Sequence, residues 1–148
     1  MNIINKLIDI KLLNISRICN LIKLDFETKD NQTICIHIQS ALFRGLELGN
    51  LLITSNDIYV PSIQHKKSLK FKWDLPGNTL FDDQLLLFKK KVLGKKVISV
   101  DLKNKDLFIE LQDNYRLEII ANTLENDTEN FRVFIQGDIN SHFVVENL

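Results

Sequence analysis

The stretch from Lys95 to Ala121 constrains the fold most, because it divides into three short alternating segments separated by two tight turns. Apolar and polar side chains alternate over residues 97–102, 107–112 and 115–121, with Asn-Lys and Asp-Asn pairs between them. A period of two places successive side chains on opposite faces of a strand, and Asn and Asp tolerate tight-turn conformations. The stretch therefore predicts an antiparallel three-stranded meander.

A weaker copy of this pattern lies about 85 residues earlier in the chain. The matched pairs are Ile8 with Leu93, Lys11 with Lys96, Leu12 with Val97, Ile15 with Val100, Ile22 with Leu107, Leu24 with Ile109 and Phe26 with Leu111. After a shorter turn, Ile34 and Ile36 correspond to Leu117 and Ile119. Each half then reads as a helix followed by three strands. Duplication explains this pattern, and so does coincidence between two amphipathic meanders, because apolar matches dominate it.

Residues 79–93 carry the clearest helix signals in the chain. Asn78 can cap the N-terminus, Asp82 and Asp83 lie in the first turn, three lysines lie near the end, and Gly94 suits the position after the helix. An apolar stripe with helical spacing consists of Phe81, Leu85, Phe88 and Val92. We expect this stripe to pack on a sheet.

The remaining pattern completes an α+β prediction. A short helix is expected over residues 2–10, and strands are expected over residues 12–19, 21–27, 33–42, 51–54, 131–135 and 143–146. Gly45 and Gly49 bracket a predicted connection, and residues 62–77 lack periodicity. We expect a single domain over residues 1–148, with a mainly antiparallel sheet of seven or eight strands and the 79–93 helix packed on it.

The charges balance overall but are distributed unevenly. Lys plus Arg and Asp plus Glu each number 19, so net charge gives no general attraction to nucleic acid or to anionic membranes. Lysines concentrate between residues 65 and 96, whereas after residue 105 the acids are opposed by Arg116 and Arg132 alone. An acidic surface favours encounter with a basic protein. The residues predicted to contact such a partner are Glu110, Glu118, Glu125, Asp127 and Glu129.

A second hypothesis uses the basic, aromatic segment before the helix. Lysines neutralise phosphates and aromatic rings stack on bases, so the segment predicts a ligand or nucleic-acid contact. The residues concerned are Lys66, Lys67, Lys70, Phe71, Lys72 and Trp73. A lysine run is more often a solvated loop, which makes nucleic acid the less favoured partner.

A third hypothesis is a small enzyme centred on Cys35 or His37, since adjacent strands can bring Cys19, Cys35 and His37 together. The histidines His37, His65 and His142 lack metal-ligand spacing, and no glycine-rich phosphate loop occurs. We therefore expect no cofactor, no metal and no catalytic residue. The preferred interpretation is a non-enzymatic binding protein.

The termini and the cysteines indicate a compartment. The N-terminal residues lack an export signal, and no apolar run approaches the length of a membrane span. The two cysteines are typical of reduced thiols. We expect a cytoplasmic protein that does not cross a membrane.

Three short motifs carry a resemblance: residues 36–39 (IHIQ), 55–59 (SNDIY) and 78–82 (NTLFD). With its order of elements, the chain resembles small uncharacterised bacterial proteins of similar length. These proteins are similar in character to immunity proteins of bacterial toxin systems. The resemblance implies binding and neutralisation of a partner toxin without chemistry, and it assigns no functional residue.

Overall fold

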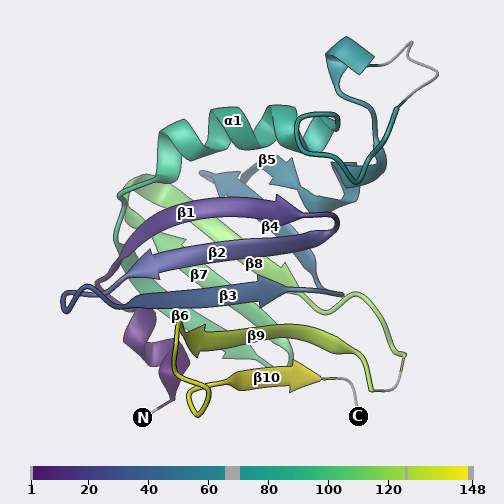
Figure 1. Ribbon diagram of the computed structural model, residues 1–148. Coiled ribbons are helices and arrows are strands. Elements are labelled where there is room, and N and C mark those ends of the chain that lie inside the picture. The colour runs from purple at the N-terminus through teal and green to yellow at the C-terminus, as the bar shows by residue number, and fades with distance from the viewer. Residues whose placement is uncertain (1, 66–70, 126, 147–148) are drawn as a thin grey trace.

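The computed structural model is a sandwich of two antiparallel sheets, and it describes residues 2–65, 71–125 and 127–146 (Figure 1). The first five strands are β1 (Lys11–Ile18), β2 (Leu21–Glu27), β3 (Thr33–Ile38), β4 (Leu42–Glu47) and β5 (Asn50–Thr54). The other strands are β6 (Val97–Lys103), β7 (Asp106–Leu111), β8 (Tyr115–Ile120), β9 (Glu129–Ile135) and β10 (Phe143–Glu146). The helices are α1 (Leu80–Val92) and the 3₁₀ turns η1 (Ile3–Leu7), η2 (Ser55–Tyr59), η3 (Ile63–His65) and η4 (Gln112–Asn114).

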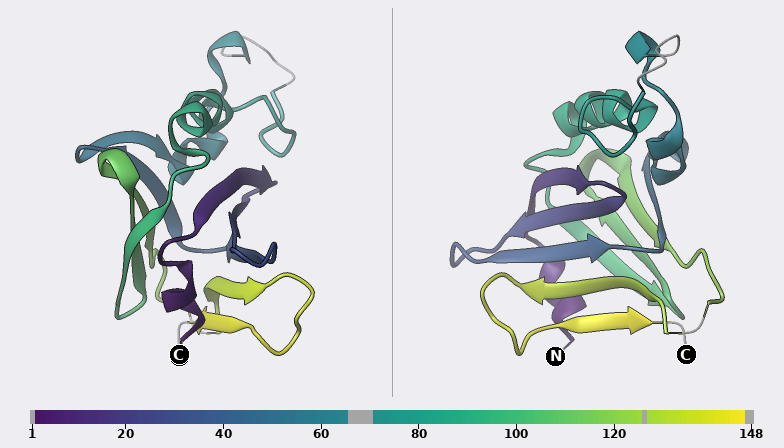
Figure 2. Two further views of the ribbon diagram at one scale, coloured as in Figure 1. Left: turned by 90° about the vertical axis from the view of Figure 1, so that its left-hand side faces the viewer. Right: turned by 45° about the vertical axis from the view of Figure 1, so that its right-hand side comes forward.

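The sheets have the strand orders β1-β2-β3-β9-β10 (sheet A) and β5-β4-β8-β7-β6 (sheet B). Figure 2 shows them as two facing layers. The α+β class and the antiparallel pairing are confirmed. The prediction of one sheet with seven or eight strands is wrong, because the described residues form ten strands in two sheets.

The chain changes sheet between β3 and β4, where one long strand was predicted. Residues 39–41 form a bend at the end of β3, in which the N–H groups of Gln39 and Ala41 both donate to the carbonyl of Asn130 on β9, at 3.0 and 3.4 Å. The prediction of a connection at Gly45 is wrong too, since Gly45 lies inside β4. An added Cβ there would lie 2.5 Å from Phe88 Cζ, so the glycine makes room for α1.

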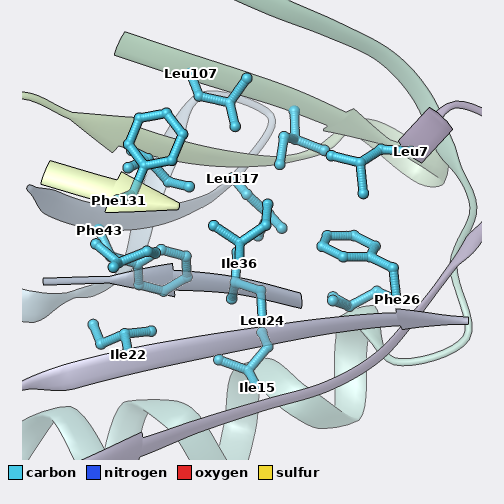
Figure 3. Close-up of a cluster of buried hydrophobic side chains, with 14 of the residues drawn as sticks. Leu7, Ile15, Ile22, Leu24, Phe26, Ile36, Phe43, Leu107, Leu117 and Phe131 are labelled. Carbon is cyan, nitrogen blue, oxygen red and sulfur yellow. The ribbon is translucent and has the colours of Figure 1, made fainter. Parts of the chain in front are cut away.

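The core lies between the sheets and consists of the inward residues of the strands together with buried residues of the helices, such as Leu7 of η1 (Figure 3). Ile22, Leu24 and Phe26 alternate with partly exposed residues along β2, as a half-buried strand requires. Each buried aliphatic or aromatic side chain contributes about 1.5–3 kcal/mol through its removal from water. The predicted inward faces of the meander, including Leu107, Ile109 and Leu117, are confirmed.

The helices close the two open sides of the sandwich. α1 contacts β1 and β5, the edge strands of different sheets, whereas η1 contacts β6 and β9 (Figure 2). The predicted helix over residues 79–93 is confirmed within one residue at each end, but Thr79, not Asn78, caps it through a capping box with Asp82. The predicted N-terminal helix is shorter than expected, a 3₁₀ helix over five residues.

The two halves of the chain follow one topological plan. In each half, three consecutive strands form a meander in one sheet, and the next two form a hairpin that extends the opposite sheet. The predicted unit of a helix and three strands is therefore too short, since each half contributes five strands. The plan makes β1–β5 equivalent to β6–β10.

Backbone details support the 85-residue offset. Lys11 and Lys96 form an isolated bridge with each other, which places them on a pseudo-twofold axis. Four hydrogen bonds surround the axis in two equivalent pairs: Asp9 N–H to Val97 O and Gly94 N–H to Leu12 O, both 2.8 Å, and Val97 N–H to Ile10 O (2.9 Å) and Leu12 N–H to Lys95 O (3.0 Å). Register shifts at residues 12–14 and 97–99 have the same offset.

Positive φ angles also occur at equivalent positions. They are 71° at Asp9 and 87° at Gly94, and 54° at Cys19 and 55° at Asn104. Both predicted matches in the third strand are displaced by two residues, since the strand registers make Ile34 equivalent to Tyr115 instead of Leu117, and Ile36 equivalent to Leu117 instead of Ile119. The displacement arises because the β7–β8 connection is four residues shorter than the β2–β3 connection: Phe26 pairs with Ile34, eight residues on, and Leu111 pairs with Tyr115, four residues on.

Candidate functional site

The five predicted partner-binding acids lie on different parts of the molecule. Glu110 and Glu118 lie on β7 and β8, on the face of sheet B that points away from the core. Glu129 begins β9 in sheet A. Glu125 and Asp127 lie in the loop over residues 121–128, which we call the β8–β9 loop.

The acids on sheet B have arginine partners. Arg116 lies directly opposite Glu110, with 3.2 Å between Nη1 and Oε1, and its Nε lies 3.0 Å from Glu118 Oε2. Arg44 Nη1 lies 3.6 Å from the other oxygen of Glu118, whose side chain is only 11% exposed. Arg116 also covers the ring of Phe108 at 4.6 Å. These charges compensate one another, so this face carries little excess negative charge.

Glu129 is similarly compensated on sheet A. Its carboxylate accepts a hydrogen bond from Arg132, which also contacts the ring of His142, with 3.1 Å between Nη1 and Nδ1. The hydrogen bond that Arg132 donates to Glu129 raises the pKa of Arg132. Glu129 therefore helps to fix Arg132 on the outer face of sheet A.

The β8–β9 loop differs from these strand positions. Glu125 and Asp127 are exposed, and neither forms an ion pair within the part of the chain that the structure describes. Leu124, next to them, is 97% exposed. The loop leaves the sandwich beyond the end of β8, away from α1 (Figure 1). It thus presents an exposed apolar side chain next to two exposed carboxylates that form no ion pair within the described residues.

The basic, aromatic segment is only partly described. Lys66, Lys67 and Lys70 lie outside the described residues. Lys72 is exposed, while Trp73 packs against the core and its ring lies 4.9 Å from the ring of Tyr59. Phe71 is half-buried. Trp73 therefore supports the loop before α1, with Tyr59 already against its ring.

The cysteine and histidine residues of the enzyme hypothesis do not form a nucleophile–base pair. Cys19 is exposed in the β1–β2 turn and Cys35 is buried on β3. Burial, together with Asp25, raises the pKa of the Cys35 thiol to about 12, so the thiol stays protonated. His37 packs edge-on against Phe134, with 4.8 Å between ring centroids. Burial, and next Lys23, lower the pKa of His37.

Within residues 2–65, 71–125 and 127–146, no cluster of three or more His, Cys, Asp or Glu side chains is placed to hold a metal ion. The described helices are all too short or too polar to cross a bilayer. Comparisons found no family model, no curated protein and no solved structure that matches this chain. The functional argument therefore depends on the residues themselves.

Sequence reasoning missed two features of the acidic region. The Asp-Asn turn places Glu110 opposite Arg116, so the hairpin register could have revealed their pairing. Leu124 carries no comparable sequence signal, because exposure of a single loop leucine depends on how the loop leaves the sheet. Glu125 and Asp127 are thus the predicted acids most available to a partner.

Proposed function

We propose that this protein is a non-catalytic protein-binding module whose β8–β9 loop contacts a basic partner. One observation carries the proposal: Leu124 is exposed beside Glu125 and Asp127, which form no ion pair within the described residues, whereas Glu110, Glu118 and Glu129 are paired with arginines. An apolar anchor inside a charged rim is the usual arrangement of an energetic contact. The resemblance to immunity proteins supports a toxin as the partner.

The experiment is site-specific photocrosslinking in extracts of the source cells. A photoreactive amino acid replaces Leu124, and the matched control places it at Leu51, a leucine of β5 that is 49% exposed. We expect a basic protein to be captured from position 124 and not from position 51. Capture at both positions with equal yield, or no capture at 124, contradicts the proposal.

Charge variants test the role of the carboxylates. Glu125→Gln with Asp127→Asn should reduce capture several-fold and remove its salt dependence, because the attraction between partners is screened by salt. The control is Glu27→Gln with Asp30→Asn, which neutralises two exposed acids at the β2–β3 turn.

If the captured protein arrests growth, co-expression of this chain should restore growth. Growth arrest that persists on co-expression contradicts the immunity assignment.

A further inference from the structure

The solvent side of α1 carries an unusual stripe. Asp83, Leu86, Leu87 and Lys90 occupy positions i, i+3, i+4 and i+7, which share one face of a helix. Leu86 and Leu87 are 67% and 64% exposed, although the opposite face of α1 already supplies the buried residues Phe81, Phe88 and Val92. The helix is therefore apolar on two sides, and the described residues cover only one of them.

Apolar surface continues beside the N-terminal half of α1. Ile63 is 73% exposed and its N–H donates to Asp83 Oδ2 at 3.1 Å, so it borders the stripe. A pocket of about 200 Å³ lies on the other side, lined by Gly77, Asp82, Asp83, Leu85, Leu86 and Lys89. Scattered apolar side chains are ordinary on a surface, but a contiguous group beside a pocket marks an interaction site.

The order of residues along the stripe identifies the occupant. It reads acid, leucine, leucine, lysine. When a second copy of the helix is turned by 180° and laid antiparallel on the first, each leucine faces a leucine and each charge faces the opposite charge. Two copies of α1 packed antiparallel, with the axis between Leu86 and Leu87, place Leu86 against Leu87 of the second copy. Asp83 then faces Lys90 of the second copy, and this pair occurs twice. The helix dipoles are also antiparallel, which favours the pairing.

We propose that α1 is a self-association surface and that a second copy of this chain covers it in a twofold dimer. A twofold interface must be self-complementary, and the stripe meets that requirement in both shape and charge. A partner of another sequence does not require this symmetry. The surface lies away from the β8–β9 loop (Figure 1), so dimer formation is compatible with a partner at that loop and is independent of the proposed function.

Sedimentation velocity of the full chain tests the dimer. Between about 1 and about 500 µM, where small interfaces associate, the mass should rise from 17.2 kDa toward twice that value. Leu86→Lys should raise the dimer dissociation constant about tenfold or more, because it puts a charge in the centre of the interface. The control, Ile98→Lys, places the same charge at a 59% exposed residue of β6 and should leave the constant unchanged.

Exchanging the two charges of the stripe distinguishes a second copy of this chain from a different partner as the occupant of the α1 surface. Asp83→Lys and Lys90→Glu should each weaken the dimer roughly five-fold, since each variant loses two rim ion pairs. Their combination should restore it, because the exchanged charges still face each other across the twofold axis. Circular dichroism confirms that each variant is folded. A wild-type chain that stays monomeric throughout the range, or a double variant weaker than both single variants, overturns the proposal.

Discussion

The two halves of the chain have the same backbone plan but differ in the length of the helix that closes each side of the sandwich. η1 closes one side of the sandwich with five residues, whereas α1 closes the other with 13. The first half contains the adaptations that hold the larger helix. Arg17 on β1 binds the N-terminal turn of α1, and Gly45 on β4 makes room for Phe88.

The residues equivalent to Arg17 and Gly45 are apolar, one packed against the core and the other buried in it. The strand registers make Leu102 equivalent to Arg17 and Val133 equivalent to Gly45. Backbone positions on the pseudo-twofold axis are therefore alike, while side chains differ where a half must accept a different neighbour. The comparison shows that the shared plan is structural and that the distinguishing surfaces, α1 and the β8–β9 loop, belong to the second half.

Replacing Arg17 by leucine, the residue type at the equivalent position 102, should give the largest loss in the free energy of unfolding. Arg17 makes two hydrogen bonds of 2.7 Å to Asp82 and also donates to the carbonyls of Cys19 and Leu75. Its side chain is 2% exposed, so Arg17→Leu leaves a largely buried carboxylate without its cation. We expect a loss of about 3 kcal/mol in the free energy of unfolding, measured by urea denaturation.

Arg17→Lys provides the control for that measurement, because it retains the charge and loses the two-pronged contact. It should be less destabilising than Arg17→Leu. A loss below about 1 kcal/mol for Arg17→Leu, the range of an exposed ion pair, contradicts the role given to this contact.

Gly45→Val introduces the residue type of the equivalent position 133, and the expected loss in the free energy of unfolding is somewhat smaller than for Arg17→Leu. The new side chain would collide with Phe88 and with Ile53 Cγ2, which lies 2.6 Å from an ideal Cβ. Overpacking of this kind costs about 1–3 kcal/mol. Thermal unfolding should show the loss, and Phe88→Leu in the same chain should recover part of it. Two substitutions with strictly additive costs would show that Gly45 does not accommodate α1.

Acid should reduce the stabilisation by Arg17. Burial alone raises the pKa of Asp82, but the hydrogen bonds and charge of Arg17, with the bonds from Thr79, hold that pKa below 3.8. A carboxyl group with a depressed pKa stabilises the fold above its unfolded pKa and loses this contribution as pH falls through the folded value. The stability gap between wild type and Arg17→Leu should therefore narrow below pH 3.8. A gap that stays constant there contradicts this assignment.

The smallest expected change in stability concerns His37, whose equivalent in the second half is Glu118. Burial and Lys23 lower the pKa of His37 below 6.5, so the unfolded chain binds the proton more readily than the fold does. This contribution to stability is complete above pH 6.5 and decreases as pH falls toward the folded pKa. His37→Gln should remove this small slope between about pH 7.5 and 5.5, and an unchanged slope would assign it to other groups.

Much of the fold follows from periodicity and from local signals. The 79–93 helix and the strands over residues 21–27 and 143–146 were predictable because the apolar spacing and the turn residues agree. The division into two sheets was not, since only a three-residue bend at residues 39–41, held by the carbonyl of Asn130, separates β3 from β4. Gly45 resembled a turn residue because the side chain that requires a glycine there, the ring of Phe88, lies far away in sequence.

The candidate site was less predictable than the fold. Acid composition indicated a negative region, but only the strand registers show that Arg44 and Arg116 compensate Glu118. The exposure of Leu124 and of the α1 leucines depends on tertiary packing, because a leucine at helical spacing usually belongs to the core.

Amide hydrogen exchange around the pseudo-twofold axis tests the shared backbone plan most directly. The N–H groups of Asp9, Leu12, Gly94 and Val97 form the four hydrogen bonds at the axis. All four should exchange slowly in NMR measurements, with protection factors in each equivalent pair within about tenfold of one another. If one member of a pair exchanges at the rate of an unstructured peptide while its equivalent is protected, the two halves do not share this axis.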